Sequence, residues 1–193
     1  LEPTPALVVA ALHAAVPAVS QYPLAQGILE AREAVARYVE RRFGVLADPD
    51  RHILITGGSK EAIFLHINLL FTRIEQGDYS SPARQLPGMA VQLEEQRRWA
   101  QLACLQLALA SCEAAMSRSA RAMALIDRAS DNLARDGAME LDAAIFAELT
   151  GKLAMERGDA TLARRALTIA RSQREGLGQR DLAEALARTL SKL

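Results

Sequence analysis

Residues 147–159 read Ala-Glu-Leu-Thr-Gly-Lys-Leu-Ala-Met-Glu-Arg-Gly-Asp, and Ala163, Leu167 and Ala170 follow them. No proline interrupts the stretch, and alanine and leucine favour helix interiors. The Gly-Asp pair at its end is typical of a tight turn between two helices. Small residues such as Gly151 allow two helices to approach closely. The stretch therefore predicts a helical hairpin.

The distribution of proline extends this prediction over the second part of the chain. The seven prolines lie at positions 3, 5, 17, 23, 49, 82 and 87, whereas alanine, with 37 copies, is the commonest residue. After Gly88 we expect only helices, and their short connections make neighbours antiparallel. The expected helices are near 89–116, 119–135, 139–156, 159–173 and 179–192.

The first part of the chain has a different pattern. We expect helices at 6–16 and 28–43, and the only convincing strand at 52–56, a short β-branched run. Another helix begins near Ser59 and reaches at least Phe71. Glycine, proline and serine gather in residues 75–88, which predicts a linker.

The predicted fold is mainly α. It consists of antiparallel helical hairpins, tetratricopeptide-like or an ordinary helical bundle, after an N-terminal helical segment with at most one short strand. The predicted divisions are an N-terminal fragment at 1–74, a linker at 75–88 and a helical-repeat domain at 89–193.

Composition and charge narrow the possible classes of function. The chain has 193 residues, half of them hydrophobic, with 23 basic and 23 acidic side chains. This excludes a disordered tail and gives no electrostatic reason to expect nucleic acid or a membrane as partner. No apolar run reaches the roughly 20 residues of a membrane helix, and no signal peptide is visible. Together with the abundance of arginine over lysine, this predicts a cytoplasmic bacterial protein.

The histidines, cysteines and the single tryptophan indicate roles in packing rather than in metal binding or catalysis. The three histidines lie far apart in sequence, so we expect no metal site. Cys104 and Cys112 lie in an alanine- and leucine-rich helical pattern, where core packing is the expected role. Trp99 is expected at a half-buried helix end, with a partner-binding indole as the alternative. No nucleophile motif or phosphate-binding Walker loop is present.

The first third of the chain resembles the start of a fold-type I pyridoxal-phosphate aminotransferase of the succinyldiaminopimelate and aspartate aminotransferase branch. The resemblance covers residues 3–71, and its order and spacing agree throughout. The matching stretches are Pro3-Thr4-Pro5, Tyr22-Pro23 with Gly27, Leu29 to Val35, Arg41 to Val45, and Ile53 to Phe64.

The glycine turn after the predicted strand is the candidate cofactor site of this segment. A strand that turns directly into a helix directs free backbone N–H groups at one point, which attracts an anion. The resemblance implies that Gly58, Ser59 and Lys60 hold the cofactor phosphate, and that Tyr22 reaches the phosphate of a neighbouring subunit. The alternative is a plain turn with a helix cap.

The other parts that the resemblance requires are missing. We find no matching Schiff-base lysine, pyridine-nitrogen aspartate or substrate-binding arginine, and electron-sink chemistry needs the first two. Residues 189–192, Thr-Leu-Ser-Lys, are superficially similar to the Schiff-base segment, which we interpret as coincidence. We therefore name no catalytic residue and expect no cofactor for the chain as given, with pyridoxal phosphate as the cofactor if this piece is functional.

Residues 89–193 resemble tetratricopeptide-type helical repeats, on the stretch quoted above. A weaker unit places Ala122, Ile126 and Ala129 at an offset of 41 residues from Ala163, Leu167 and Ala170, which is longer than the standard period of about 34. Such hairpins often leave a concave surface for a partner. An ordinary helical bundle without a groove is the alternative.

Three functions remain open from the sequence. The first is a protein-interaction module that binds an unidentified protein or self-associates, with a non-catalytic aminotransferase-like head. The second is a fragment of an aminotransferase that moves an amino group between an amino acid and a 2-oxo acid. The third is a chimeric reading frame without a joint function, suggested by the abrupt loss of resemblance after Phe71.

Overall fold

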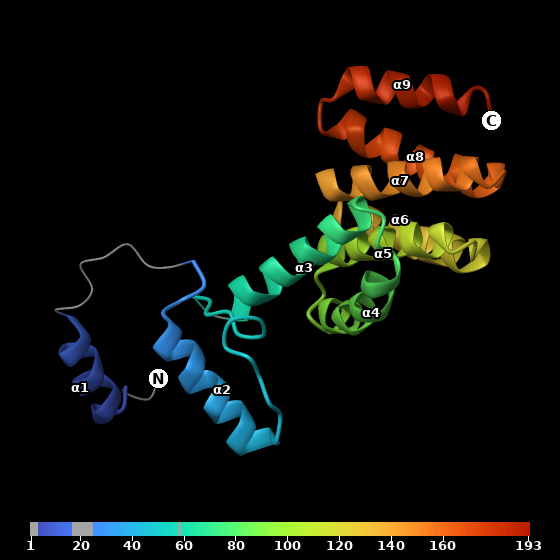
Figure 1. The fold of residues 1–193 in the computed structure, drawn as a ribbon. Coiled ribbons are helices and arrows are strands. Elements are labelled where there is room, and N and C mark those ends of the chain that lie inside the picture. The colour runs from blue at the N-terminus through green and yellow to red at the C-terminus, as the bar shows by residue number, and fades with distance from the viewer. Residues whose placement is uncertain (1–3, 17–24, 58) are drawn as a thin grey trace. The chain divides into compact units, whose positions relative to one another are not determined.

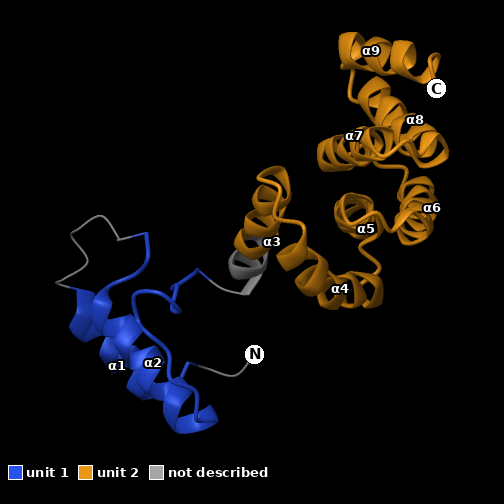
Figure 2. Cartoon of the chain, turned by 45° about the vertical axis from the view of Figure 1, so that its right-hand side comes forward, with its two compact units in different colours: residues 1–63 blue, residues 64–193 orange. Residues whose placement is uncertain are grey.

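The computed structural model describes residues 4–16, 25–57 and 59–193, and it describes no side chain of residues 59–64. The chain divides into two compact units, residues 1–63 and 64–193 (Figure 2). The division falls inside a helix, earlier in the chain than the linker predicted at 75–88. Each unit is described by itself below.

Helices account for the regular structure of the described residues, which confirms the mainly α class. Most lie within a few residues of their predicted positions. They are α1 Ala6–Ala15, α2 Leu29–Phe43, α3 Ser59–Glu75, α4 Ser80–Glu95, α5 Trp99–Ala115, α6 Ser119–Asp136, α7 Leu141–Glu156, α8 Ala160–Gly176 and α9 Arg180–Leu190 (Figure 1).

The strand predicted at 52–56 is absent, and residues 53–56 have no regular structure. The backbone N–H of Ile55 in this segment donates a hydrogen bond to the carbonyl of Gln26 at 3.3 Å. A strand needs neighbouring strands to satisfy its edges, and the described part of the chain provides none. The β-branched run therefore follows an irregular path.

Arg32 organises the loops around α2 in the first unit. Its guanidinium donates to the backbone oxygens of Gly27 at 3.3 Å and Pro49 at 2.9 Å, and it forms an ion pair with Asp50. Gly27 has φ +80°, and a Cβ there would lie 2.6 Å from a side-chain carbon of Ile55. The glycine is thus required for both its conformation and this close approach. Arg32 is buried, but no hydrophobic side chain described in this unit is.

The second unit is a stack of antiparallel helical hairpins. Helix α5 packs against α4 and α6, α8 packs against α7 and α9, and α5 also lies beside α7 (Figure 1). Almost every residue of α5 from Ala100 to Ala114 is buried, as expected for a helix that packs against α4, α6 and α7. Phe71 of α3 packs edge-on against Phe146 of α7, with ring centroids 4.5 Å apart. One continuous core therefore joins α3 to α9.

The segment predicted as a linker is mostly helical. Helix α4 begins at Ser80, and Pro82 lies in its first turn, where the helix needs no N–H from that residue. Pro82 is fully buried, so it belongs to the core. Pro87 lies in the helix interior. Proline and serine in these positions are compatible with a helix, and composition alone gave the wrong structure for 75–88.

The long helix predicted at 89–116 is two helices. Helix α4 ends at Glu95 and α5 begins at Trp99, with Arg97 between them at φ +55°. A residue other than glycine is uncommon in this left-handed conformation. The turn has no glycine to mark it, which is why the sequence pattern missed it.

Turns of the same geometry recur along the second unit. In five turns the N–H of the positive-φ residue donates to the carbonyl three residues earlier, and the next N–H donates to the carbonyl five residues earlier, at 2.8–3.0 Å. This pattern is a helix C-terminal motif of the Schellman type. With the longer turn at Gly137, positive-φ residues occur every 20 or 21 positions: Gly77, Arg97, Ser117, Gly137, Gly158 and Gly178.

Candidate functional site

The predicted phosphate turn is only partly described. Helix α3 begins at Ser59, as the sequence predicts. Tyr22 and Gly58 lie outside the described residues, and so do the side chains of Ser59 and Lys60. The assignment of these four residues to a cofactor phosphate therefore stays a prediction.

The other two lysines lie in the second unit, on α7 and after α9. Lys152 forms an ion pair with Glu148 one turn earlier on α7, at 3.0 Å. Lys192 lies in the turn after α9, and its backbone N–H donates to the carbonyl of Thr189.

The two cysteines are confirmed as core residues. Cys104 and Cys112 are buried and unpaired in α5. Removal from water raises the pKa of each thiol from 9.0 to about 12. Such thiols stay protonated at neutral pH and are poor nucleophiles. Among the described residues, no group of three His, Cys, Asp or Glu side chains could hold a metal ion.

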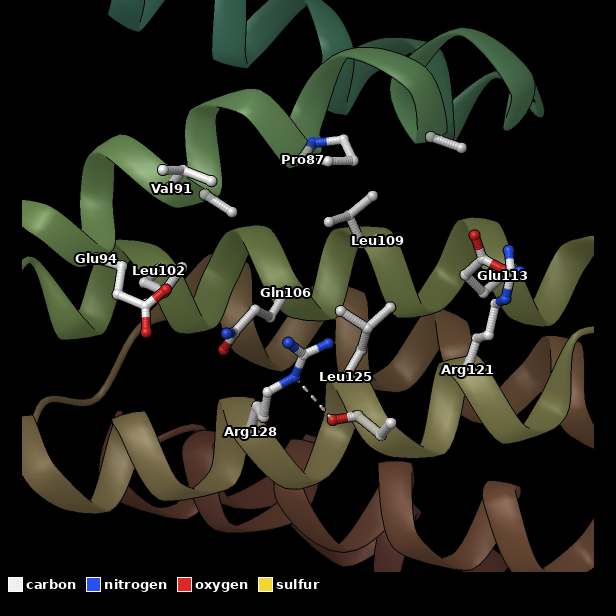
Figure 3. A pocket seen from close by; sticks show the side chains of 13 residues that line it. Pro87, Val91, Glu94, Leu102, Gln106, Leu109, Glu113, Arg121, Leu125 and Arg128 are labelled. Atoms are coloured by element: carbon white, nitrogen blue, oxygen red, sulfur yellow. Dashed lines mark hydrogen bonds between the residues drawn. The ribbon is translucent and has the colours of Figure 1, made fainter.

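A groove in the second unit is the best-formed candidate site. It lies between α4 and α6, with α5 as its floor, and has a volume of about 390 Å³ (Figure 3). This is within the usual range of ligand pockets. Apolar side chains dominate the lining, contributed by all three helices: Ala83, Pro87, Ala90, Val91, Leu102, Leu109, Ala124 and Leu125.

Polar groups enter the groove from its floor and from the α6 wall. Gln106 of α5 accepts a hydrogen bond from the Nδ2 of Asn132 at 3.0 Å, and both residues are buried. Arg121 and Arg128 line the α6 wall, and the Nε of Arg128 donates to the carbonyl of Ala124 at 3.3 Å. Glu94 and Glu113 line it as well. The groove can therefore offer apolar area together with hydrogen-bond donors.

Sequence reasoning did not identify the groove residues. They come from three helices, two of which (α4 and α5) were predicted with wrong bounds, and no local motif joins them. The recurrence of small residues indicated only that the helices pack closely. Trp99 was predicted at a half-buried helix end, which is confirmed. The guanidinium of Arg135 lies 4.4 Å from the centre of its ring.

Comparison with known proteins finds relatives for part of the chain. It is 42% identical over 82 residues to an LL-diaminopimelate aminotransferase of Gloeobacter violaceus, and 39% identical over 82 residues to LL-diaminopimelate aminotransferase 2 of Trichormus variabilis. Each match covers 41% of this chain and 20% of the relative. An LL-diaminopimelate aminotransferase of Nitratidesulfovibrio vulgaris is 44% identical over 78 residues, 39% of this chain and 19% of the relative.

These matches show that the chain contains an aminotransferase-like segment. The chain spans about a fifth of the length of the curated relatives it matches. No family model matches the chain, and no solved structure matches it. In the part of the chain that the structure describes, no helix is long and apolar enough to cross a bilayer.

Proposed function

We propose that the chain is a protein-interaction module, built from tetratricopeptide-like hairpins, with a non-catalytic aminotransferase-like segment before it. The observation that carries this proposal is the groove over α5, which exposes apolar side chains and donors in an otherwise closely packed unit. Turns of one geometry at spacings of 20 or 21 residues support a repeat of about 40 residues. We further propose a cytoplasmic location, without nucleic acid or membrane as partner.

Selection of peptides against the full chain tests this proposal. Val91 is 56% exposed on the α4 wall, so Val91→Glu places a charge in the groove without disturbing the core. Leu182→Glu on α9 is the matched control, since Leu182 is 47% exposed and outside the groove. We expect enriched peptides whose binding is lost with Val91→Glu and kept with Leu182→Glu. A selection that enriches nothing contradicts the proposal and favours a chimeric reading frame.

A fragment of an aminotransferase is the second candidate, and the identity of 39–44% to LL-diaminopimelate aminotransferases favours it. In this alternative, Tyr22, Gly58, Ser59 and Lys60 hold the phosphate of pyridoxal phosphate. The test is to add pyridoxal phosphate to the pure chain and record its absorption spectrum. We expect no Schiff-base band. A band that disappears in Lys192→Ala supports this second candidate and contradicts the first.

A further inference from the structure

The floor of the groove contains the side-chain amide of Gln106. Gln106 is 7% exposed, and its oxygen is occupied by the hydrogen bond from Asn132. The Nε2 of the same amide is a hydrogen-bond donor, and Gln106 lines the groove. The amide lies at the bottom of the groove, between α5 and α6 (Figure 3). An occupant that places an oxygen at this point can accept a hydrogen bond from the amide.

Two cations on the α6 wall are free to meet an occupant. Arg121 and Arg128 line the groove seven residues apart, which is about 10.5 Å along a helix. No carboxylate of the described residues lies within ion-pair distance of either one. Both side chains are exposed at the groove rim, on each side of Leu125 (Figure 3).

The two acidic residues of the lining, Glu94 and Glu113, form no ion pair with Arg121 or Arg128. Glu113 forms an ion pair with Arg118 at 3.6 Å through its Oε2, and this oxygen is buried without a hydrogen bond among the described residues. Glu94 stands at one end of the opposite, α4 wall, after the apolar residues Pro87 and Val91. The groove thus has a cationic edge along α6 and a mainly apolar edge along α4.

We propose that the groove takes an amphipathic helix of another protein, with an acidic edge. This rests on the proposed function and names the chemistry of its partner. Apolar side chains of the helix cover Val91, Leu109 and Leu125, and the volume of about 390 Å³ suits the side chains of one helix face. Two carboxylates seven residues apart pair with Arg121 and Arg128, because two helical turns reproduce their separation. An oxygen between them accepts from Gln106.

The helices of the first unit do not offer this pattern. Helix α1 has no acidic residue at all. Helix α2 has Glu33 and Glu40 seven residues apart, but at 100° per residue they project on the side opposite its apolar residues Val35 and Tyr38. A second copy that docked α1 or α2 would therefore leave the two arginines unpaired. The complementary charge pattern favours a separate partner.

Two synthetic helical peptides and the full chain test the proposal. Both peptides carry the same apolar stripe, and one has glutamate where the other has lysine at two positions seven residues apart. We expect the acidic peptide to bind at least tenfold tighter, measured by fluorescence anisotropy of labelled peptide. Higher salt should reduce the difference, since screening weakens exposed pairs.

Charge reversal assigns the preference to these two residues. Arg121→Glu with Arg128→Glu should invert the order of the two peptides. Arg84→Glu with Arg188→Glu, at exposed arginines outside the groove, should leave it unchanged. Circular dichroism and melting of each variant show whether it is folded. Equal binding of both peptides, no effect of the reversal, or self-association that competes with the peptide overturns the proposal.

The selection described under the proposed function separates the two ideas. If it enriches groove-binding peptides without an acidic edge, the partner chemistry is wrong and the interaction role stands. If it enriches nothing, the interaction role itself fails. Enrichment of amphipathic sequences with paired carboxylates supports both.

Discussion

The two units differ first in what they bury. Among the side chains described, every buried hydrophobic one lies at or after Leu70, and the first unit buries only Arg32. Apolar residues such as Leu46, Phe43 and Leu12 are largely exposed there. Burial of apolar surface is what offsets the conformational entropy of folding. The first unit, which contains most of the stretch that resembles an aminotransferase, therefore has no hydrophobic core among its described side chains, whereas the second unit has one.

The largest expected difference between the units is in the loss of stability when a phenylalanine is replaced by alanine. Phe146 is 1% exposed and packs against Phe71, so Phe146→Ala should lower the free energy of unfolding by about 3–5 kcal/mol. Phe43→Ala, at a residue 63% exposed in the first unit, should change it by less than about 0.5 kcal/mol. Urea unfolding followed by circular dichroism measures both. Similar losses in the two variants would contradict the contrast between the units.

Within the second unit, α7 packs more closely against its neighbour at Gly151 than α4 does at Gly88. A Cβ at Gly151 of α7 would lie 2.5 Å from Leu167 of α8, whereas at Gly88 of α4 nothing lies within 4 Å. Gly151→Ala should therefore cost about 1–3 kcal/mol through overpacking. Gly88→Ala should gain about 0.5–1 kcal/mol, because alanine favours the helix interior. Thermal melting should show a lower melting temperature for Gly151→Ala and a higher one for Gly88→Ala. A stabilised Gly151→Ala would show that α7 and α8 are not tightly packed.

The N-terminal cap of α8 makes a pH-dependent contribution to the free energy of unfolding. Asp159 accepts a hydrogen bond from the N–H of Leu162 at 3.0 Å, and this bond holds the pKa of its carboxyl below the ordinary 3.8. A lowered pKa in the folded state adds stability that is present above pH 3.8 and lost as the pH falls through the folded value. Asp159→Ala should cost about 1 kcal/mol at pH 7 and progressively less in acid below pH 3.8. Unfolding at a series of pH values measures the difference, and a cost independent of pH would exclude the charged cap.

The recurring turns allow a small gain in stability. Arg97 is exposed, has φ +55° and occupies a place where Gly77, Gly158 and Gly178 stand in equivalent turns. Arg97→Gly should raise the free energy of unfolding by about 0.5–1 kcal/mol, because glycine adopts positive φ without strain. Ser117→Gly should gain less, since the hydroxyl of Ser117 accepts a hydrogen bond from Arg157 at 3.3 Å. A destabilised Arg97→Gly would contradict the turn geometry.

The sequence predicted the features that depend on residues close together along the chain, such as helices and helix ends. Periodic apolar residues placed most helices, and Gly44 ends α2 at φ +68° as a C-terminal glycine should. Two predictions, the linker at 75–88 and the single helix at 89–116, were wrong because the residue type did not indicate the conformation. Pro82 is compatible with the first turn of a helix, and Arg97 occupies a turn that usually has glycine.

Longer-range features could not be predicted from the sequence. The β-branched run at 52–56 had strand propensity but no partner strand. Residues 83–94 and 102–128 form the groove only when three helices pack together, so no spacing in the sequence marks it. The distribution of charge along its walls depends on which arginines form ion pairs with carboxylates. These pairs are defined only by the folded structure of the unit.

Hydrogen exchange of the full chain, with and without the acidic peptide, tests the account most directly. We predict slow exchange of backbone amides in α5 to α8, fast exchange in residues 25–57, and slower exchange in α4 and α6 when the peptide is present. The first two results follow from the location of the core, and the third from the groove. Protection of residues 25–57 equal to that of α5, or a peptide effect confined to helices outside the groove, would contradict it.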